Sequence, residues 1–280
     1  MIKKPSVDIL AKIKEQYENE GKNKPPNILF YADWGIGKTT LAMTLPKPIL
    51  LQEFDPGGHR LREVNDLAKS GDLTVDTRWQ SQYQMTPTEI YNKWSVDYRK
   101  MKSSGVFDQI AEQGGYYVMD SFTLFQKLMI GAVMDRKDKI STHDGSGEFT
   151  TLTRRGYGVQ HTAVDFVIRD LLGLPCGVMI IAHMEELQDS KGNTLGFEPL
   201  ITGAKLRKQL PVLFEEIYIM QRIGKKRRLY LEPYGLYNAK SHLISLHPEK
   251  IKPMYDVSEK GSFSFERDII NKTKIQITKE

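Results

Sequence analysis

The chain has 280 residues, of which 40% are hydrophobic and 27% charged, a composition that suits a globular protein with one large α/β domain or two small ones. No apolar run reaches the roughly 18 to 20 residues that span a bilayer, and the charged N-terminus excludes the core of a signal peptide, so we expect a cytoplasmic protein with no membrane partner. The net charge of +5 permits a polyanionic partner, while the single cysteine, Cys176, excludes an internal disulfide and is expected to be a small buried residue.

The start of the chain predicts a helical extension, a strand, a glycine turn and a helix. Residues 1–24 are polar and lysine-rich with helical spacing, and the two prolines of "KNKPP" end this extension. The apolar run 27–32 is bounded by proline and by a glycine-rich turn, as is typical of a buried strand. From Lys38 the chain carries helix formers at apolar spacing until two further prolines.

Strands and helices then alternate through the middle of the chain. The predicted strands are 48–55, 73–79, 116–121 and 177–183, and the predicted helices are 59–69, 86–104, 122–136 and 159–173. Alternation of this kind predicts a mostly parallel sheet with helices on both faces. The polar stretch 137–156 has scattered glycine and little periodicity, which predicts a long loop of the kind that is usually functional or disordered.

Past His183 the pattern changes to antiparallel pieces. A hairpin around 191–193, a short basic helix at 203–214 and two strands joined at 224–227 are predicted. Residues 243–280 are polar with short β-prone pieces, and they predict a C-terminal tail rather than a further domain.

The segment "YADWGIGKTT" at 31–40 nearly matches the phosphate-binding loop of P-loop NTPases, but Ala32 stands where the pattern has its first glycine. That glycine lets the chain leave the strand, and alanine is tolerated there better than a larger residue. In such loops backbone N–H groups surround a polyanion, the lysine reaches the β and γ phosphates, and the hydroxyl ligates Mg²⁺. The strand before the motif and the helix after it disfavour a chance match. The predicted nucleotide contacts are Asp33, Trp34, Gly35, Ile36, Gly37, Lys38, Thr39 and Thr40.

A second metal ligand is expected at the end of a neighbouring buried strand, where such sites hold Mg²⁺ with a carboxylate. Asp120 ends the apolar run "YYVMDS" in this way. We therefore predict Thr39 and Asp120 as the metal ligands, although an acid at a strand end is also often structural.

Hydrolysis further needs a group that orients or deprotonates the attacking water. Many NTPases carry a glutamate directly after the strand-ending Asp, but here that position is Ser121. The candidates are Glu53 and Asp55, and Asp55 is preferred because it sits at the turn; the alternative is that its side chain only caps that turn. His183, at the end of the strand 177–183, is expected to sense the γ phosphate, with an ordinary hydrogen-bonded histidine as the alternative.

The segments "GIGKTTLA", "DPGG", "VMDS" and "IIAHMEE" occur in this order in RecA-like core ATPases, and residues 25–242 resemble in particular the phage-encoded single-domain recombinases of the Sak type, which assist single-strand annealing. The resemblance implies a RecA-like P-loop NTPase core with a mostly parallel twisted sheet, flanking helices and a late antiparallel hairpin. It implies that ATP and Mg²⁺ lie between subunits of a ring or filament and that loops hold DNA. In such proteins a basic residue of the neighbouring subunit reaches the γ phosphate. The resemblance gives that role to Lys240, although His242 stands where an arginine is expected.

DNA contact is predicted from three basic runs, which lie in the stretch 137–156, in the segment after His183 and at the hairpin tip 225–228. Basic residues mixed with aromatic ones suit phosphates and stacked bases, although such runs are more often a solvated surface. The predicted contacts are Arg154, Arg155, Lys205, Arg207 and Lys208.

Together these features predict a DNA-stimulated ATPase that binds single-stranded DNA and acts in phage-type recombination or annealing. Its partners would be single-stranded DNA, further copies of itself, and a single-strand-binding or annealing protein. Two alternatives stay open: a helicase-like or helicase-loader motor of replication, and a scaffold whose assembly is gated by nucleotide.

Overall fold

The computed structural model of the chain describes residues 9–15, 24–80, 85–135, 141–143 and 150–273. Residues 9–15 form a short helix with exposed side chains, and the rest of the predicted extension before residue 24 lies outside the described residues. Much of the stretch 137–156 also lies outside them. Within the described ranges, no helix is both long and apolar enough to cross a membrane.

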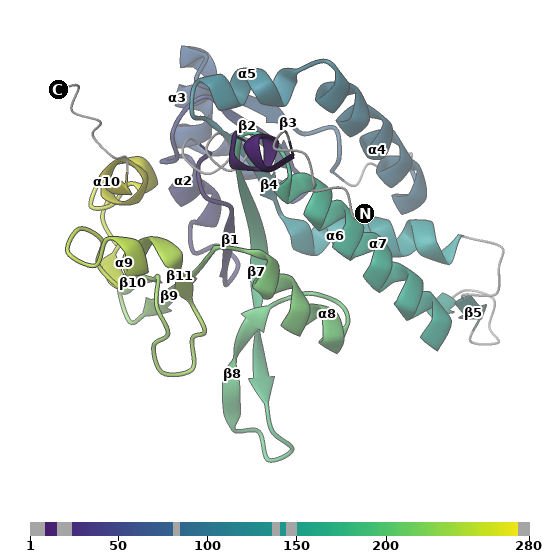
Figure 1. The fold of residues 1–280 in the computed structure, drawn as a ribbon. Helices are drawn as coiled ribbons and strands as arrows, with labels where there is room; N and C mark the ends of the chain where they lie inside the picture. Colours follow the sequence, from purple (N-terminus) through teal and green to yellow (C-terminus); the bar gives the residue numbers. More distant parts are fainter. Residues whose placement is uncertain (1–8, 16–23, 81–84, 136–140, 144–149, 274–280) are drawn as a thin grey trace, which may run out of the picture.

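A mostly parallel sheet forms the centre of the molecule (Figure 1). Its parallel strands are β1 (Ile28–Ala32), β2 (Ile49–Glu53), β3 (Leu73–Asp76), β4 (Tyr116–Asp120), β7 (Gly177–Gln188) and β9 (Glu216–Ile223). The antiparallel strands are β8 (Thr194–Pro199), β10 (Lys226–Tyr230), β11 (Lys240–Ser241) and β12 (Met254–Asp256). The order across the sheet is β12-β10-β9-β1-β7-β4-β2-β3, with β8 paired to β7 and β11 to β9. A separate short hairpin joins β5 (Ser141–His143) and β6 (Thr150–Leu152).

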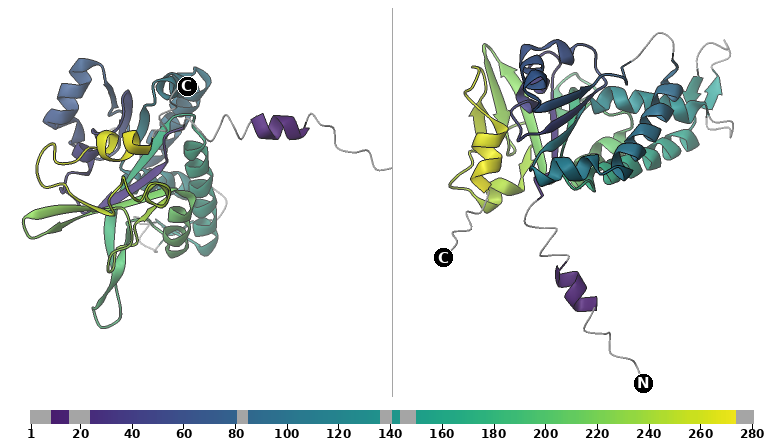
Figure 2. Two further views of the ribbon diagram at one scale, coloured as in Figure 1. Left: turned by 60° about the vertical axis from the view of Figure 1, so that its left-hand side comes forward. Right: turned by 90° about the horizontal axis from the view of Figure 1, so that it is seen from above.

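Helices lie on both faces of the sheet (Figure 2). They are α2 (Lys38–Ala42), α3 (Arg62–Ser70), α4 (Pro87–Ser103), α5 (Val106–Glu112), α6 (Phe122–Met134), α7 (Arg154–Leu172), α8 (Ala204–Gln209), α9 (His242–Leu246) and α10 (Asn271–Thr273). Short helical turns of other types are η1 (Gly58–Arg60), η2 (Leu210–Leu213) and η3 (Glu266–Ile270). The predicted α/β class, with its mostly parallel sheet, flanking helices and late antiparallel strands, is confirmed.

Helix α7 and strand β7 are among the elements that differ from the predicted ones. Helix α7 begins five residues before the predicted start, because the Thr153 side chain accepts a hydrogen bond from the Gly156 backbone at 3.1 Å and caps the helix there. Strand β7 runs past His183 to Gln188, because β8 supplies an antiparallel partner beyond the end of the parallel sheet. The hairpin of β7 and β8 projects from the sheet in Figure 1.

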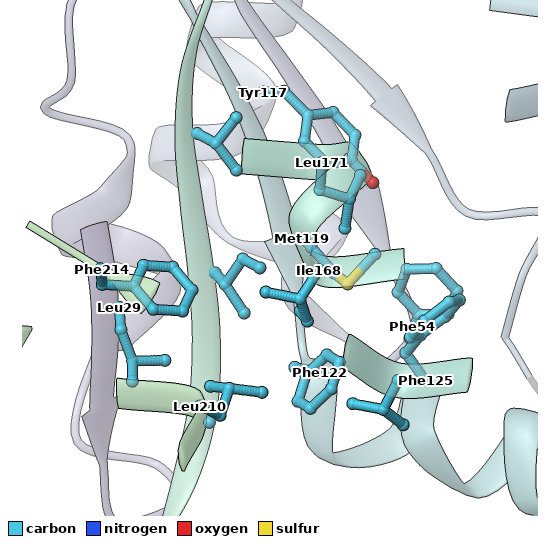
Figure 3. Packing of buried hydrophobic residues seen from close by; sticks show 14 of the residues in the cluster. Leu29, Phe54, Tyr117, Met119, Phe122, Phe125, Ile168, Leu171, Leu210 and Phe214 are labelled. Carbon is cyan, nitrogen blue, oxygen red and sulfur yellow. The ribbon is translucent and has the colours of Figure 1, made fainter. Parts of the chain in front are cut away.

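The two faces of the sheet bury two separate cores. Side chains alternate across each strand, so Leu29 and Tyr31 of β1 enter one core while Ile28 and Phe30 enter the other. The first core packs α4, α6, α7 and α8 against the sheet, as Figure 3 shows around Phe122 and Phe125. Cys176 is buried in this core, and burial raises the pKa of its thiol to about 11.

The segment after residue 242 is part of the second core, where the sequence had predicted a tail. β12 pairs with β10 at the sheet edge, and Phe263, Phe265, Ile269 and Ile270 are buried. The rings of Phe265 and Phe30 meet edge to face with centroids 5.9 Å apart. The sequence did not indicate this role, because polar residues separate the buried ones. The spacing of the few apolar residues matches neither a helix nor a strand.

Candidate active site

The phosphate loop joins the end of β1 to the start of α2. Gly35 and Gly37 both adopt positive φ, at 67° and 103°, where residues with a side chain are strained. Ala32, by contrast, is a regular residue of β1, paired to His183 on one side and to Met220 on the other, and fully buried. The chain therefore needs no glycine at this position, which accounts for the departure from the motif.

Lys38 is held at the mouth of the loop by three contacts. Its ammonium donates to the carbonyl oxygens of Ala32 at 3.0 Å and of Asp33 at 2.6 Å, and it lies 3.3 Å from His183 Nδ1. Burial lowers the pKa of Lys38, and the nearby carboxylates, first Asp120, act in the opposite direction. The cation is thus preorganised among acids and carbonyls.

Thr39 and Asp120 face each other across the start of α2. The Thr39 hydroxyl donates to Asp120 Oδ2, and the Asp120 side chain is almost fully buried. Burial raises the pKa of Asp120 to about 6; the bond from Thr39 lowers it and the charge of Asp55 raises it further. Hydroxyl and carboxylate oxygens at this spot fit Mg²⁺, which takes a few protein oxygens and completes its shell with phosphate and water. The described residues contain no group of three or more His, Cys, Asp or Glu that could hold a metal ion by themselves.

Asp55 and His183 form a hydrogen-bonded pair beside Lys38. His183 Nε2 lies 2.7 Å from Asp55 Oδ2, and the Ser121 hydroxyl donates to Asp55 Oδ1 at 2.6 Å. Because a carboxylate only accepts, the Nε2 atom carries the proton, which leaves Nδ1 free to accept from Lys38. Burial raises the pKa of Asp55, but the bonds from His183 and Ser121 outweigh it, so that the net pKa lies below the ordinary value. Asp55 is therefore an ionised carboxylate with about a fifth of its side chain exposed, at 22%.

Glu53, two residues earlier, is enclosed by donors. Its carboxylate accepts from the His59 backbone N–H at 2.8 Å, lies 2.7 Å from His59 Nδ1, and accepts from Gln80 at 2.8 Å. The side chain is 1% exposed. Glu53 is thus the acid that holds the turn after β2, a role that the sequence had offered as the alternative for Asp55. His59 and Gln80 carried no sequence signal, because a single polar residue in a turn has no pattern.

A cavity of about 250 Å³ lies at the edge of the sheet where the parallel strands end. It unites most of the predicted site: Gly35, Gly37, Lys38, Thr39, Thr40, Glu53, Asp55, Asp120 and His183. The Ile36 side chain points into the second core and is buried, which leaves its backbone for the contact with nucleotide that stays a prediction. Asp33 and Trp34 are exposed at the mouth of the loop, Trp34 to 85%.

Ser121 and Thr123 join the site through contacts that the sequence did not predict. The peptide bond between Asp120 and Ser121 is cis, and Ser121 holds Asp55. The Thr123 hydroxyl accepts from the His183 backbone N–H at 3.0 Å and donates to the Leu200 carbonyl at 3.1 Å. Of these two residues, only Ser121 could have been found from the sequence, because it occupies the position directly after the acid that ends the strand.

Lys240 lies at the other edge of the sheet. It pairs with Ile217 near the start of β9, whereas the cavity lies where the parallel strands end. Its ammonium donates to the Phe214 carbonyl at 2.9 Å. The chain after β10 turns back along the sheet, which separates Lys240 from the phosphate loop of its own chain. Action on a neighbouring subunit stays a prediction.

The residues predicted to bind DNA are only partly gathered on one surface. Arg155 of α7 and Lys205 and Lys208 of α8 are exposed, and the two helices meet where His161 Nε2 lies 2.7 Å from Gln209 Oε1. Arg207 turns inward and pairs with Glu185. The Arg154 side chain lies outside the described residues.

Arg227, which the sequence grouped with the basic hairpin tip, faces the phosphate loop. Its guanidinium donates to the Ile36 carbonyl at 3.2 Å and to the Ser258 carbonyl at 2.8 Å. Side chains alternate between the two faces along β10, so Arg227 points away from its basic neighbours. The run of basic residues in the sequence does not by itself predict this direction.

Comparison with protein families matches residues 24–243 to the family described as the AAA domain. No curated protein matches the chain in sequence. Among solved structures, a prototypical ATPase from the type III secretion system of pathogenic bacteria is similar with 14% identity and a TM-score of 0.45. The similarity covers 70% of this chain and 52% of that one, so the chain spans about half the length of that ATPase.

Proposed function

The chain belongs to the AAA domain family of P-loop ATPases, and from this premise we propose that it hydrolyses ATP with Mg²⁺ and that single-stranded DNA stimulates the reaction. One observation carries the proposal: the loop lysine, the Thr39–Asp120 oxygen pair and the Asp55–His183 pair line a single cavity. Phosphate ligand, metal ligand and proton acceptor are the three parts that phosphoryl transfer to water needs.

Each side chain has a part in the proposed reaction. The loop backbone and Lys38 bind the β and γ phosphates, and Thr39 and Asp120 would hold Mg²⁺, which neutralises phosphate charge when bound. Asp55 orients the attacking water and accepts its proton as the water oxygen bonds to the γ phosphorus and the bond to the β-phosphate oxygen breaks. Its partial exposure, 22% against 1% for Glu53, supports this choice, because an attacking water can reach Asp55 from the cavity.

A chain of hydrogen bonds supports coupling between this cavity and the basic surface of α7 and α8. His183 contacts Asp55 through its ring and Thr123 through its backbone, and Thr123 bonds Leu200 just before α8. The His183 carbonyl also accepts from the Leu200 backbone N–H at 2.7 Å. A change at the γ phosphate could thus shift α8, which carries Lys205 and Lys208. The role in recombination or annealing, with assembly into a ring or filament, rests on the sequence resemblance.

The decisive experiment is ATP turnover with and without single-stranded DNA. Lys38→Ala should reduce turnover by about 100-fold, because a charge aimed at the transferring phosphate is lost. The double variant Lys205→Ala, Lys208→Ala should keep basal turnover and lose the stimulation. Lys69→Ala with Lys100→Ala is the matched control, since both lysines are exposed on other helices.

The outcomes separate the candidate functions. Turnover that DNA leaves unchanged, together with binding that does not weaken as salt rises, would contradict the DNA proposal. Unwinding of duplex DNA would favour the helicase-like motor. Light scattering on wild type and Lys240→Ala tests self-association, which the variant should weaken.

A further inference from the structure

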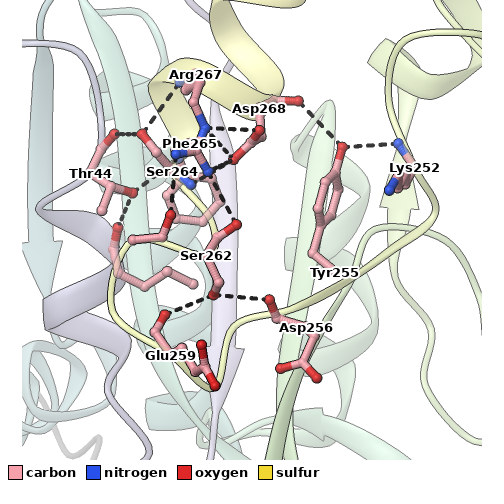
Figure 4. Close-up of polar contacts among 12 residues, drawn as sticks. Thr44, Lys252, Tyr255, Asp256, Glu259, Ser262, Ser264, Phe265, Arg267 and Asp268 are labelled. Carbon is pink, nitrogen blue, oxygen red and sulfur yellow. Dashed lines mark hydrogen bonds and ion pairs between the residues drawn. The ribbon is translucent and has the colours of Figure 1, made fainter.

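The C-terminal segment, residues 257–268, lies beside α2 and the phosphate loop, and lines with them a second cavity of about 380 Å³. Figure 4 shows the polar contacts that hold this segment. The Phe265 backbone N–H donates to the Thr44 hydroxyl at 3.0 Å. The Thr44 carbonyl accepts from the Glu266 backbone N–H at 3.0 Å and from the Ser264 hydroxyl at 3.3 Å. Thr44 lies two residues past the end of α2, so these bonds fix the segment to that end of the helix.

Arg227 of β10 joins the same segment to the phosphate loop at the start of α2. Its guanidinium donates through Nη2 to the Ser258 carbonyl at 2.8 Å and through Nη1 to the Ile36 carbonyl at 3.2 Å. The Arg227 backbone is fixed as well, because its N–H donates to the Ser258 hydroxyl and its carbonyl accepts from the Val257 N–H, both at 2.8 Å. Helix α2 has five residues, far fewer than the roughly 12 to 15 that an isolated helix needs. Its position therefore depends on tertiary contacts of this kind.

The bond to the Ile36 carbonyl sets the direction of the next backbone N–H. The peptide between Ile36 and Gly37 is trans, so the Ile36 carbonyl and the Gly37 N–H point to opposite sides of the chain. Arg227 lines the second cavity, whereas Lys38 and Asp120 line the first. A carbonyl that is held towards Arg227 therefore turns the Gly37 N–H towards the side on which the phosphates are proposed to bind.

An arginine suits this position better than a lysine. A Cβ atom on Gly37 would lie 2.9 Å from Arg227 Nη1, so the guanidinium rests directly on the loop. The planar guanidinium presents several donors in a fixed arrangement and can hold two carbonyls at once. A lysine ammonium is a compact charge on a flexible stem and does not fix two acceptors relative to each other.

We propose that Arg227 is a positioning residue of the phosphate loop, which holds the peptide between Ile36 and Gly37 so that the Gly37 N–H faces the bound phosphates. The C-terminal segment in turn holds Arg227 in place through Ser258. The proposal rests on the proposed nucleotide site and deepens it, because a residue that does not touch the phosphates then controls their affinity. A loop that is ordered before the ligand arrives loses less conformational freedom on binding.

The test measures the binding of inorganic pyrophosphate and of ADP to the full chain by isothermal titration calorimetry. Arg227→Ala should weaken both ligands by about tenfold, the loss expected when a hydrogen bond to a charged ligand is misaligned. Arg227→Lys keeps the charge and should still weaken both by at least about fivefold, because lysine does not fix the two carbonyls. Arg228→Ala removes the same charge from the adjacent residue and should leave both affinities within about twofold.

Amide hydrogen exchange without ligand gives a readout that a loss of overall stability does not move. Exchange in residues 35–40, followed by mass spectrometry, should be faster in Arg227→Lys than in wild type, while exchange in α6 should stay the same. Gly71→Ala is the matched control for stability, because its φ of 84° strains the turn after α3. That variant should change neither the exchange of the loop nor the two affinities.

The results distinguish this proposal from the one on which it rests. Wild type that binds neither pyrophosphate nor ADP would overturn the nucleotide site and this proposal together. If wild type binds both and Arg227→Ala binds them equally well, only the role of Arg227 is overturned. Full affinity in Arg227→Lys would show that Arg227 supplies charge alone, and a loss of ADP with pyrophosphate unchanged would show that it does not act on the phosphate loop. Either result contradicts the positioning role.

Discussion

Replacement of Asp120 by asparagine should stabilise the free protein at neutral pH, although it removes a proposed metal ligand. The carboxyl group is buried, and its pKa of about 6 in the folded chain compares with an ordinary 3.8, a difference of about 2.2. At about 1.36 kcal/mol for each pKa unit, the ionised group costs the folded state about 3 kcal/mol. Asparagine keeps an acceptor for the Thr39 hydroxyl and carries no charge, so most of this cost should disappear.

The stability that Asp120→Asn gains should increase with pH. A carboxyl whose folded pKa is raised destabilises the fold above that pKa, and the cost declines as the pH falls from about 6 towards 3.8. The advantage of Asp120→Asn should therefore approach 3 kcal/mol near pH 8 and fall to about half of that near pH 5. Equilibrium urea unfolding without nucleotide or metal measures it, provided that the slope m is unchanged.

Asp55→Asn is the matched control in the same cavity, because the pKa of Asp55 is shifted the other way. His183 and Ser121 stabilise the ionised form of Asp55 in the folded protein. This contribution to the free energy of unfolding is present above the pKa of the unfolded state and is lost as the pH falls through the pKa of the folded state. Asp55→Asn should therefore destabilise the protein near pH 8. If Asp120→Asn also destabilises it, or gains the same stability at both pH values, the assignment of a buried, unfavourable charge at Asp120 is wrong.

Two further predictions concern the phosphate loop. Ala32→Gly should leave ADP affinity within about twofold and lower the free energy of unfolding by about 1 kcal/mol, because glycine at a buried strand position only gains backbone freedom in the unfolded chain. Calorimetry measures the affinity, and a large gain would show that the loop does need its first glycine. Gly37→Ala should lower the urea midpoint and weaken ADP binding, because φ is 103° and the new Cβ meets Arg227. Gly71→Ala, with φ of 84° and open space, should lower stability but keep ADP affinity, and equal ADP losses in both variants would contradict a local effect at the loop.

Much of the element order could be predicted from the sequence, because it depends on spacing over a few residues. The capping box of α4 shows this, since Thr86 and Glu89 exchange hydrogen bonds and Pro87 begins the helix, as the sequence signals predict. Helix α5 was missed because its seven residues are too few for a periodic pattern. The far half of β7 was missed because its partner strand comes later in the chain.

The candidate site shows the same division. The approach of Asp120 to Thr39 could be predicted, because the parallel strands of one sheet end at the same edge, although β7 lies between β1 and β4. The distinct surroundings of Glu53 and Asp55 could not, since both acids lie at the end of β2, and the donors that each receives come from the turn and from the ends of other strands.

The sequence by itself determined the α/β class, the phosphate loop and the acid that faces it, because each is written in a contiguous motif or a short periodic run. Only the tertiary structure decided that Ala32 needs no glycine's freedom, that Lys240 lies at the opposite edge from the loop, and that the C-terminal segment walls a second cavity. Arg227 and Ile36 are 191 residues apart along the chain and joined by a hydrogen bond. Such contacts depend on strand register and on the packing of distant segments, which no local pattern of residues specifies.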